Sequence, residues 1–168
     1  MKGKYWFCMI GGAMTLSFLL SFVHPSGMTR TVVKSSGVLL SGAQISPALR
    51  KIVEQKCADC HSQQTRWPLY GRLAPASWLL EHDVAEARSH WDASRWSDYS
   101  REERMQLFSR LALRAKSASM PPARYTLLHP GAKLQQSERV SLYEWARTER
   151  RRLRSLPSQP EKTNATVR

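Results

Sequence analysis

A chain of 168 residues is long enough for one domain and a short additional segment, and its hydrophobic fraction of 42% excludes a fully disordered protein. The net charge of +13, from 26 Lys and Arg against 13 Asp and Glu, favours an anionic partner such as an acidic protein, a lipid surface or nucleic acid. No zinc-finger spacing, glycine-rich recognition loop or basic zipper accompanies this charge, so the sequence predicts no nucleic-acid partner.

The N-terminus begins with the basic segment Met1-Lys-Gly-Lys4 and continues from Tyr5 to Val23 without a charged residue. A helix of that length rises about 28 Å, close to the hydrocarbon thickness of a bilayer. Both a cleaved signal peptide and a retained anchor fit this pattern. Because Phe22-Val-His-Pro-Ser-Gly27 lacks the Ala-x-Ala pattern of a cleavage site, we expect an uncleaved transmembrane helix within residues 1–23.

Residues 24–45 are rich in Ser, Thr and Gly and are predicted to form a linker, whose extended length is about 70 Å. The pair Ser46-Pro47 predicts the first helix of the folded domain, because a capping hydroxyl precedes a proline at the first helical position. The apolar face of this helix reaches the cysteine pair through residues at helical spacing, namely Leu49, Ile52, Val53 and Cys57.

Two further helices are predicted in the middle of the chain. One runs from about Pro75 to His90 and is opened by its proline. The other begins at Ser100, where Ser100-Arg-Glu-Glu103 has the pattern of a capping box.

The last predicted helix begins at Ser137 and is separated from the preceding one by Ser119-Met-Pro-Pro122, which no helix can cross. No convincing strand pattern is present, so the predicted fold class is all-α. We expect the folded domain to cover residues 46–154, and residues 155–168 to form a disordered basic tail.

The segment Cys57-Ala-Asp-Cys60-His61 is the C-x-x-C-H signature of c-type haem attachment. Two thiols at this spacing can bond two vinyl groups on one haem edge, and the histidine then projects to the iron. A redox dithiol lacks a βαβ context here, zinc lacks a second ligand pair, and a structural disulfide leaves His61 unexplained. The motif predicts one covalent haem c, with His61 on the iron, in a domain on the periplasmic face of the cytoplasmic membrane.

Met120 is the predicted second axial ligand, because it stands in a loop that two prolines stiffen. A methionine on the apolar face of a helix would more simply fill the core. A His/Met pair also gives electron-transfer cytochromes a raised potential. His129, which precedes Pro130, is the alternative ligand, and His82 and His90 are weaker candidates.

A cluster of rings and cations follows the haem motif directly. Its members are predicted to donate hydrogen bonds to the two haem propionates: Arg66, Trp67, Tyr70 and Arg72. The alternative is that Trp67 lines the core while the arginines face water.

Several linked blocks resemble the haem-binding domain family of small exported cytochrome c-like proteins. They are Cys57-Ala-Asp-Cys60-His61-Ser62, Thr65-Arg-Trp-Pro68, Ala74-Pro-Ala-Ser-Trp78, Asp83-Val84, and Met120-Pro-Pro-x-x-Tyr125 with His129-Pro130. The resemblance implies a helical, cytochrome c-like domain around one covalent haem. The chain departs from the family pattern in two places: where the family often shows Gly-Arg and then Asn-Phe-Ser, it has Ala87-Arg88 and Asp92-Ala-Ser94.

These patterns together predict a membrane-anchored monohaem c-type cytochrome that carries single electrons between periplasmic or membrane redox partners. Its basic charge favours an acidic redox partner protein. The alternative function is a haem-based sensor or gas-binding module with a labile sixth ligand. An enzymatic role is not expected, because the single C-x-x-C-H excludes a two-haem peroxidase.

Overall fold

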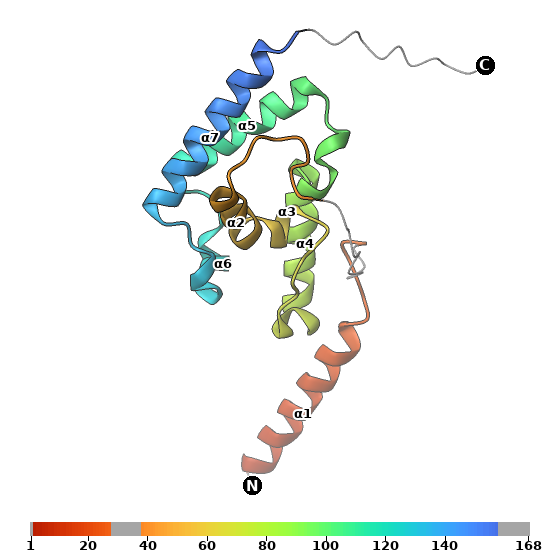
Figure 1. Cartoon of the computed structure of the whole chain (residues 1–168). Helices are drawn as coiled ribbons and strands as arrows, with labels where there is room; N and C mark the ends of the chain where they lie inside the picture. Colours follow the sequence, from red (N-terminus) through yellow and green to blue (C-terminus); the bar gives the residue numbers. More distant parts are fainter. Residues whose placement is uncertain (1, 28–37, 158–168) are drawn as a thin grey trace, which may run out of the picture.

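The computed structural model of the chain describes residues 2–27 and 38–157, and within these ranges the protein is all-α, as predicted, with no strand (Figure 1). The α-helices are α1 (Lys2–Leu20), α2 (Pro47–Lys56), α3 (Ala58–His61), α4 (Ala76–His90), α5 (Arg101–Ser117), α6 (Ala123–Leu128) and α7 (Gln136–Ser155). Short 3₁₀ turns connect them: η1 (Leu69–Arg72), η2 (Ala93–Asp98) and η3 (Pro130–Ala132).

Helix α2 begins where its capping residues predict. The Ser46 side chain accepts a hydrogen bond from the Leu49 backbone amide at 3.3 Å, and Pro47 occupies the first helical position. Leu49 and Val53 are buried on the inner face, so the helix runs along the core and ends at Lys56, next to the first cysteine of the motif.

Ser46→Ala is expected to lower the free energy of unfolding by about 1 kcal/mol, because it removes the side-chain acceptor at the start of α2. Urea denaturation followed by circular dichroism measures the change. Ser46→Asp retains an acceptor and serves as the control. A loss of equal size in Ser46→Asp would contradict the capping explanation.

The predicted capping box at the start of α5 is confirmed. The Glu103 amide donates to the Ser100 hydroxyl at 3.2 Å, and the Glu103 carboxylate accepts from the Ser100 amide at 2.7 Å. Helix α5 ends at Ser117, ahead of Ala118 in the left-handed region at φ 54°, so the break before the two prolines is also confirmed. Helix α7 begins at Gln136, one residue before the predicted start.

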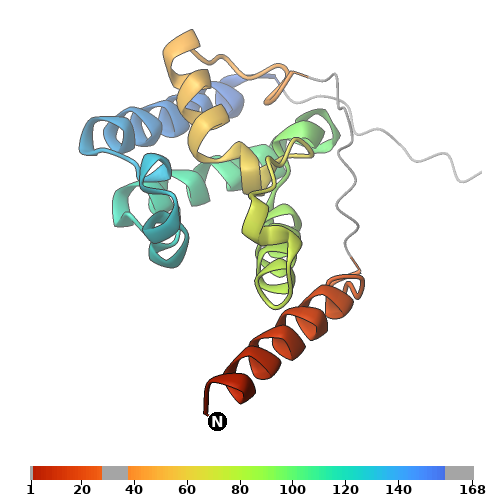
Figure 2. The same cartoon turned by 90° about the horizontal axis from the view of Figure 1, so that it is seen from below.

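Helices α5 and α7 pack against each other along their length, and their facing sides contribute a large part of the core (Figures 1 and 2). They are antiparallel: the Arg101 guanidinium at the start of α5 donates to the Leu156 carbonyl just beyond the end of α7, at 2.8 Å. Near the middle, the rings of Phe108 and Trp145 meet edge to face, with centroids 5.2 Å apart. Small or aliphatic residues fill the rest of this interface, including Ala112, Ala115, Leu142, Ala146 and Leu153, all of them buried.

The folded domain begins before residue 46. Leu39 and Leu40 are only 5% and 2% exposed and belong to the core, and the Leu40 amide donates to the Ala93 carbonyl at 3.1 Å. Residues 38–45 are therefore packed structure, which differs from the predicted linker over residues 24–45. The rest of that prediction over residues 28–37, and the predicted tail over residues 158–168, lie outside the described residues.

The transmembrane helix predicted in residues 1–23 is not supported. A helix forms there, but none of the helices in the described parts of the chain has both the length and the apolarity required to cross a bilayer. Helix α1 includes both Lys2 and Lys4 and ends at Leu20, ahead of the predicted end at Val23, so its mean hydropathy is lower than the uncharged stretch suggests. Its apolar side chains are exposed on all sides, among them Trp6, Phe7, Met9, Met14 and Leu16.

The segment after α1 is attached to helix α4. The Trp78 indole donates to the Val23 carbonyl at 2.8 Å, and both carboxylate oxygens of Glu81 lie 3.1 Å from Nδ1 of His24. Glu81 is completely buried, so His24 places a polar partner beside a carboxylate that water does not reach. These contacts make residues 21–24 part of the domain surface.

Candidate functional site

The two cysteines and the histidine of the motif share one tight turn between α2 and α3. The chain bends at Cys57, whose carbonyl accepts from the amides of Cys60 at 3.2 Å and His61 at 2.9 Å. Neither thiol is engaged in a disulfide. The local backbone thus holds two free thiols and one imidazole close together, as the motif requires.

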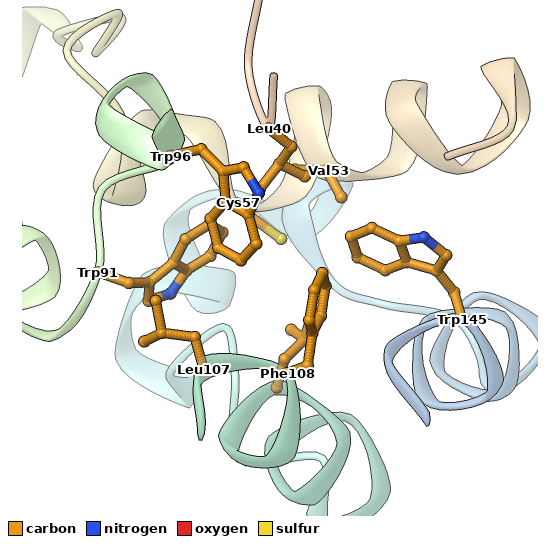
Figure 3. Close-up of a pocket in the computed structure, with 9 residues that line it drawn as sticks. Leu40, Val53, Cys57, Trp91, Trp96, Leu107, Phe108 and Trp145 are labelled. Atoms are coloured by element: carbon orange, nitrogen blue, oxygen red, sulfur yellow. The ribbon is translucent and has the colours of Figure 1, made fainter. Parts of the chain in front are cut away.

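Cys57 forms part of the wall of an apolar cavity between α2, η2, α5 and α7 (Figure 3). The other lining residues are aliphatic or aromatic: Leu40, Val53, Trp91, Trp96, Leu107, Phe108, Leu111 and Trp145. The aromatic rings contact one another in sequence. Trp96 meets Trp91 at 6.4 Å and Phe108 at 5.1 Å between centroids, and these edge-to-face contacts fix the shape of the wall.

Burial keeps both thiols protonated. It raises the pKa of Cys57 to about 12, with further contributions from Cys60 and Glu138, and it raises the pKa of Cys60 to about 11, with Asp59 and Asp83 adding to the effect. A redox-active dithiol requires at least one thiol with a lowered pKa, because the thiolate is the reactive form. The environment therefore argues against the thioredoxin-like alternative.

The imidazole of His61 is oriented by the backbone of Trp91. Nδ1 lies 3.2 Å from the Trp91 carbonyl oxygen, and the two rings stack with centroids 4.7 Å apart. Burial lowers the pKa of His61, while hydrogen bonds to the Trp91 and Ala87 carbonyls oppose this effect. Because a carbonyl only accepts, Nδ1 carries the proton, and the neutral ring keeps its lone pair on Nε2, the atom available to a metal.

The loop after His61 is held by side chains that the sequence reasoning did not assign to the site. The Arg88 guanidinium donates to the Ser62 carbonyl and to the Thr65 hydroxyl, both at 2.9 Å. The Gln63 amide donates to the Ser94 hydroxyl at 3.0 Å, and Asp92 accepts from the Gln63 side chain. Arg88 and Ser94 agree with the family pattern at these two blocks, whereas Asp92 stands where the family often has asparagine, so the blocks themselves were the available signal.

Met120 lies in the segment between α5 and α6, immediately before Pro121. Its side chain is 39% exposed and is not among the residues that line the cavity. Helix α6, which follows this segment, is attached to α4, where the Arg124 guanidinium forms a two-point ion pair with Asp83 at 2.7 and 3.2 Å. The structure therefore leaves Met120 as a partly exposed side chain just before an anchored helix.

His129, the alternative sixth ligand, is enclosed by two tyrosines. Its Nε2 lies 3.3 Å from the Tyr70 hydroxyl, its Nδ1 lies 3.2 Å from the Tyr125 carbonyl oxygen, and its ring stacks on Tyr125 at 4.2 Å. Burial raises the pKa of Tyr125 to about 12, with Asp59 and Cys60 contributing. Both nitrogens of His129 thus have protein partners. The thioether sulfur of Met120 is only a weak acceptor and requires no hydrogen bond.

The predicted propionate donors are not gathered at one point. Arg66 forms an ion pair with Asp59 at 2.9 and 3.1 Å, Tyr70 contacts His129, Arg72 is exposed, and Trp67 is partly buried outside the cavity lining. The weaker histidine candidates are exposed on α4, where His82 and His90 lie 3.9 and 4.0 Å from the same carboxylate, Glu86.

The donor set fits a covalent haem. Two free thiols stand on the turn that bears His61, one of them in the wall of an apolar, aromatic cavity, and the lone pair of the imidazole is on the nitrogen that can bind iron. Cys57 and Cys60 would hold the porphyrin edge and His61 would ligate the iron. When bound, the haem would supply one-electron redox chemistry.

Comparison with protein families gives a match over residues 15–148 to a family described as "Haem-binding domain". Comparison with curated proteins and with solved structures gives no match. The matched range covers most of the chain and includes the cysteine motif, the cavity walls and the segment that joins α1 to α4.

Proposed function

The chain belongs to the haem-binding domain family, and from this premise we propose that it is a monohaem c-type cytochrome that transfers single electrons. Cys57 and Cys60 bind the haem covalently, and His61 is its first axial ligand. The observation that carries the proposal is the hydrogen bond from Nδ1 of His61 to the Trp91 carbonyl, beside two free thiols. It sets the imidazole in the tautomer and orientation that an axial ligand needs.

The cavity walls support electron transfer as the role of the haem. Trp91, Trp96 and Phe108 exclude water from the side of the site that Cys57 faces, and a dry pocket is one of the means by which a protein sets a haem potential. The contacts among these rings would also limit the rearrangement that accompanies a change of iron charge. The protein is then a carrier, and no catalytic reaction of its own is assigned to it.

The sixth ligand is assigned to Met120. The segment that bears it leads into α6, which is held to α4 by Arg124, and the residue after α6, His129, contacts Tyr70 on η1. His129 already has protein partners at both nitrogens, and this favours the methionine. The propionate roles of Arg66, Trp67, Tyr70 and Arg72 remain part of the proposal, and Arg66 would act through its present pairing with Asp59.

Export and membrane association complete the proposal. Covalent haem attachment implies an exported domain, and we place it at the periplasmic face of the cytoplasmic membrane. The exposed apolar side chains of α1 support attachment to that membrane, since a large exposed apolar surface is typical of a membrane or protein contact. The partner is an acidic redox protein, in keeping with the net charge of +13.

A haem-based sensor is the second candidate function, favoured by one observation. Met120 is 39% exposed and lies outside the cavity lining, so a gaseous ligand could displace it more readily than a buried methionine.

The absorption spectrum of the haem-loaded full chain tests the proposal. It is recorded oxidised, reduced, and reduced with carbon monoxide. A low-spin spectrum that carbon monoxide does not change is expected of an electron carrier with two firm ligands. A high-spin spectrum that carbon monoxide shifts would favour the sensor, and the lack of any haem after coexpression with the attachment machinery would end both.

Met120→Ala is expected to leave the covalent haem in place but to vacate the sixth position, so that the reduced variant binds carbon monoxide. The reason is that alanine offers no ligand atom. Spectra and the redox potential of the variant measure the effect. Met105→Ala on α5 removes a partly buried methionine of the core and is the control. An unchanged spectrum and potential in Met120→Ala would remove this residue from the mechanism.

A further inference from the structure

Helix α7 presents a row of cations on one face. Four arginines there are exposed, and we call them the arginine face: Arg147, Arg150, Arg151 and Arg154. Within this part of the helix the one carboxylate is Glu149, which is buried and already accepts from Arg152 at 2.8 and 2.9 Å. The face therefore carries four positive charges without an exposed carboxylate between them.

Three arginines in other parts of the chain pair with a carboxylate, although the exposed Arg72, Arg110 and Arg114 have no ion pair among the described residues. Arg66 pairs with Asp59, Arg95 with Asp98 and Arg124 with Asp83, all at 2.7 to 2.9 Å. None of the four residues of the arginine face forms an ion pair with a described residue. Two of them contact neutral groups: the Arg147 guanidinium lies 5.4 Å from the centre of the Tyr143 ring, and Arg151 donates to a threonine hydroxyl.

This arrangement is unfavourable for the isolated helix. Arg147 and Arg151 are four residues apart, as are Arg150 and Arg154, and the remaining neighbours are three apart, so every adjacent pair repels. The helix dipole favours cations only in the last turn, which accounts for Arg154 but not for Arg147. The exposed Glu144, three residues before Arg147, offsets part of this repulsion at one end of the face, but no described carboxylate forms an ion pair with the four arginines. An anionic partner on the same face would offset the rest.

The position of the face distinguishes between kinds of partner. In both views of the molecule α7 lies on the side of the domain away from α1, which projects from the region of α4 (Figures 1 and 2). A membrane that contacts the exposed apolar side chains of α1 would therefore not lie against α7. An acidic protein approaching the domain from solution would meet α7 directly.

The face also lies close to the proposed haem site. Trp145 projects from the opposite side of α7 into the cavity, where it is seen next to Phe108 and Val53 (Figure 3). One helix of about 10 Å diameter thus separates the arginine face from the cavity wall.

We propose that the arginine face of α7 is the docking surface for an acidic redox protein. This inference rests on the proposed electron-carrier function and assigns the surface at which the partner binds. Opposite charges speed the encounter and orient the partner over α7, and the effect weakens as salt screens the exposed charges.

Charge reversal at matched sites tests the proposal. Arg147→Glu with Arg151→Glu reverses two exposed arginines four residues apart on α7. Arg110→Glu with Arg114→Glu makes the same change of net charge at the same spacing on the exposed side of α5. The probe is a fluorophore-labelled poly-glutamate peptide, whose binding to the full haem-loaded chain is followed by fluorescence anisotropy at low and high salt.

The α7 variant is expected to bind the peptide at least about tenfold more weakly at low salt, whereas the α5 variant should lose less than about threefold. Both differences should shrink at high salt. Equal losses in the two variants would show that net charge alone acts, and would overturn the assignment.

Vesicles of phosphatidylcholine and phosphatidylserine form the second arm of the test. Their binding should be unchanged in the α7 variant, and a loss as large as the loss of peptide binding would assign the face to lipid and overturn the proposal. The absorption spectrum of the same samples reports haem separately. Selective peptide binding by a chain that carries no haem would retain the docking surface and reject the electron carrier.

Discussion

Cys57→Ala together with Cys60→Ala is expected to abolish covalent haem attachment. The wild-type protein should keep its haem through acidified-acetone extraction and haem-stained denaturing electrophoresis, whereas the double variant should lose it completely. The reason is that these are the two thiols on the turn that bears His61, and the backbone bonds of that turn hold them within reach of one porphyrin edge.

Cys8→Ala is the matched control, because Cys8 lies on α1, is exposed, and stands outside the motif. It should leave attachment intact. The single variants provide a finer test, since each should retain one thioether and give a pyridine haemochrome spectrum between those of a c-type and a b-type haem. Haem that stays covalently bound to the double variant would disprove the assignment of the motif.

Arg152→Met should lower the free energy of unfolding by about 2 kcal/mol, because it leaves a buried carboxylate without its cation. Glu149 is only 2% exposed, and Arg152 donates to both of its oxygens, at 2.8 and 2.9 Å. The Gln44 amide, which donates to Glu149 at 3.1 Å, remains and limits the loss. Urea denaturation measures the effect as a lower midpoint with an unchanged slope.

Arg151→Met is the control for this prediction, since it removes a neighbouring arginine that has no carboxylate partner among the described residues. Its effect should be within about 0.5 kcal/mol. Adding Glu149→Met to Arg152→Met should recover much of the lost stability, because replacing both members of a buried pair by apolar groups is often neutral. Equal destabilisation by Arg151→Met and Arg152→Met would show that the buried pair is not responsible.

The sequence by itself determined the starts of α2 and α5 and the cysteine motif, whereas α6 was not predicted. The start of α2 depends on Ser46 and Pro47, and the start of α5 on Ser100 and Glu103, so each signal and its effect are at most three residues apart. The same holds for the motif, in which Cys57, Cys60 and His61 are brought together by one turn of backbone. Such features follow from local hydrogen bonding and sterics, which a sequence displays directly.

Only the tertiary structure decided what surrounds the motif. Trp91, thirty residues further along the chain, orients the His61 ring, and Arg88 holds the loop that follows His61. The buried Leu40 extends the core into a segment that was predicted to be a linker. The same applies to α1, where the sequence predicted a bilayer span, whereas no helix in the described parts of the chain is long and apolar enough to cross a membrane. These outcomes depend on contacts between residues that are far apart in the sequence and on the positions at which helices end. Packing between helices determines both.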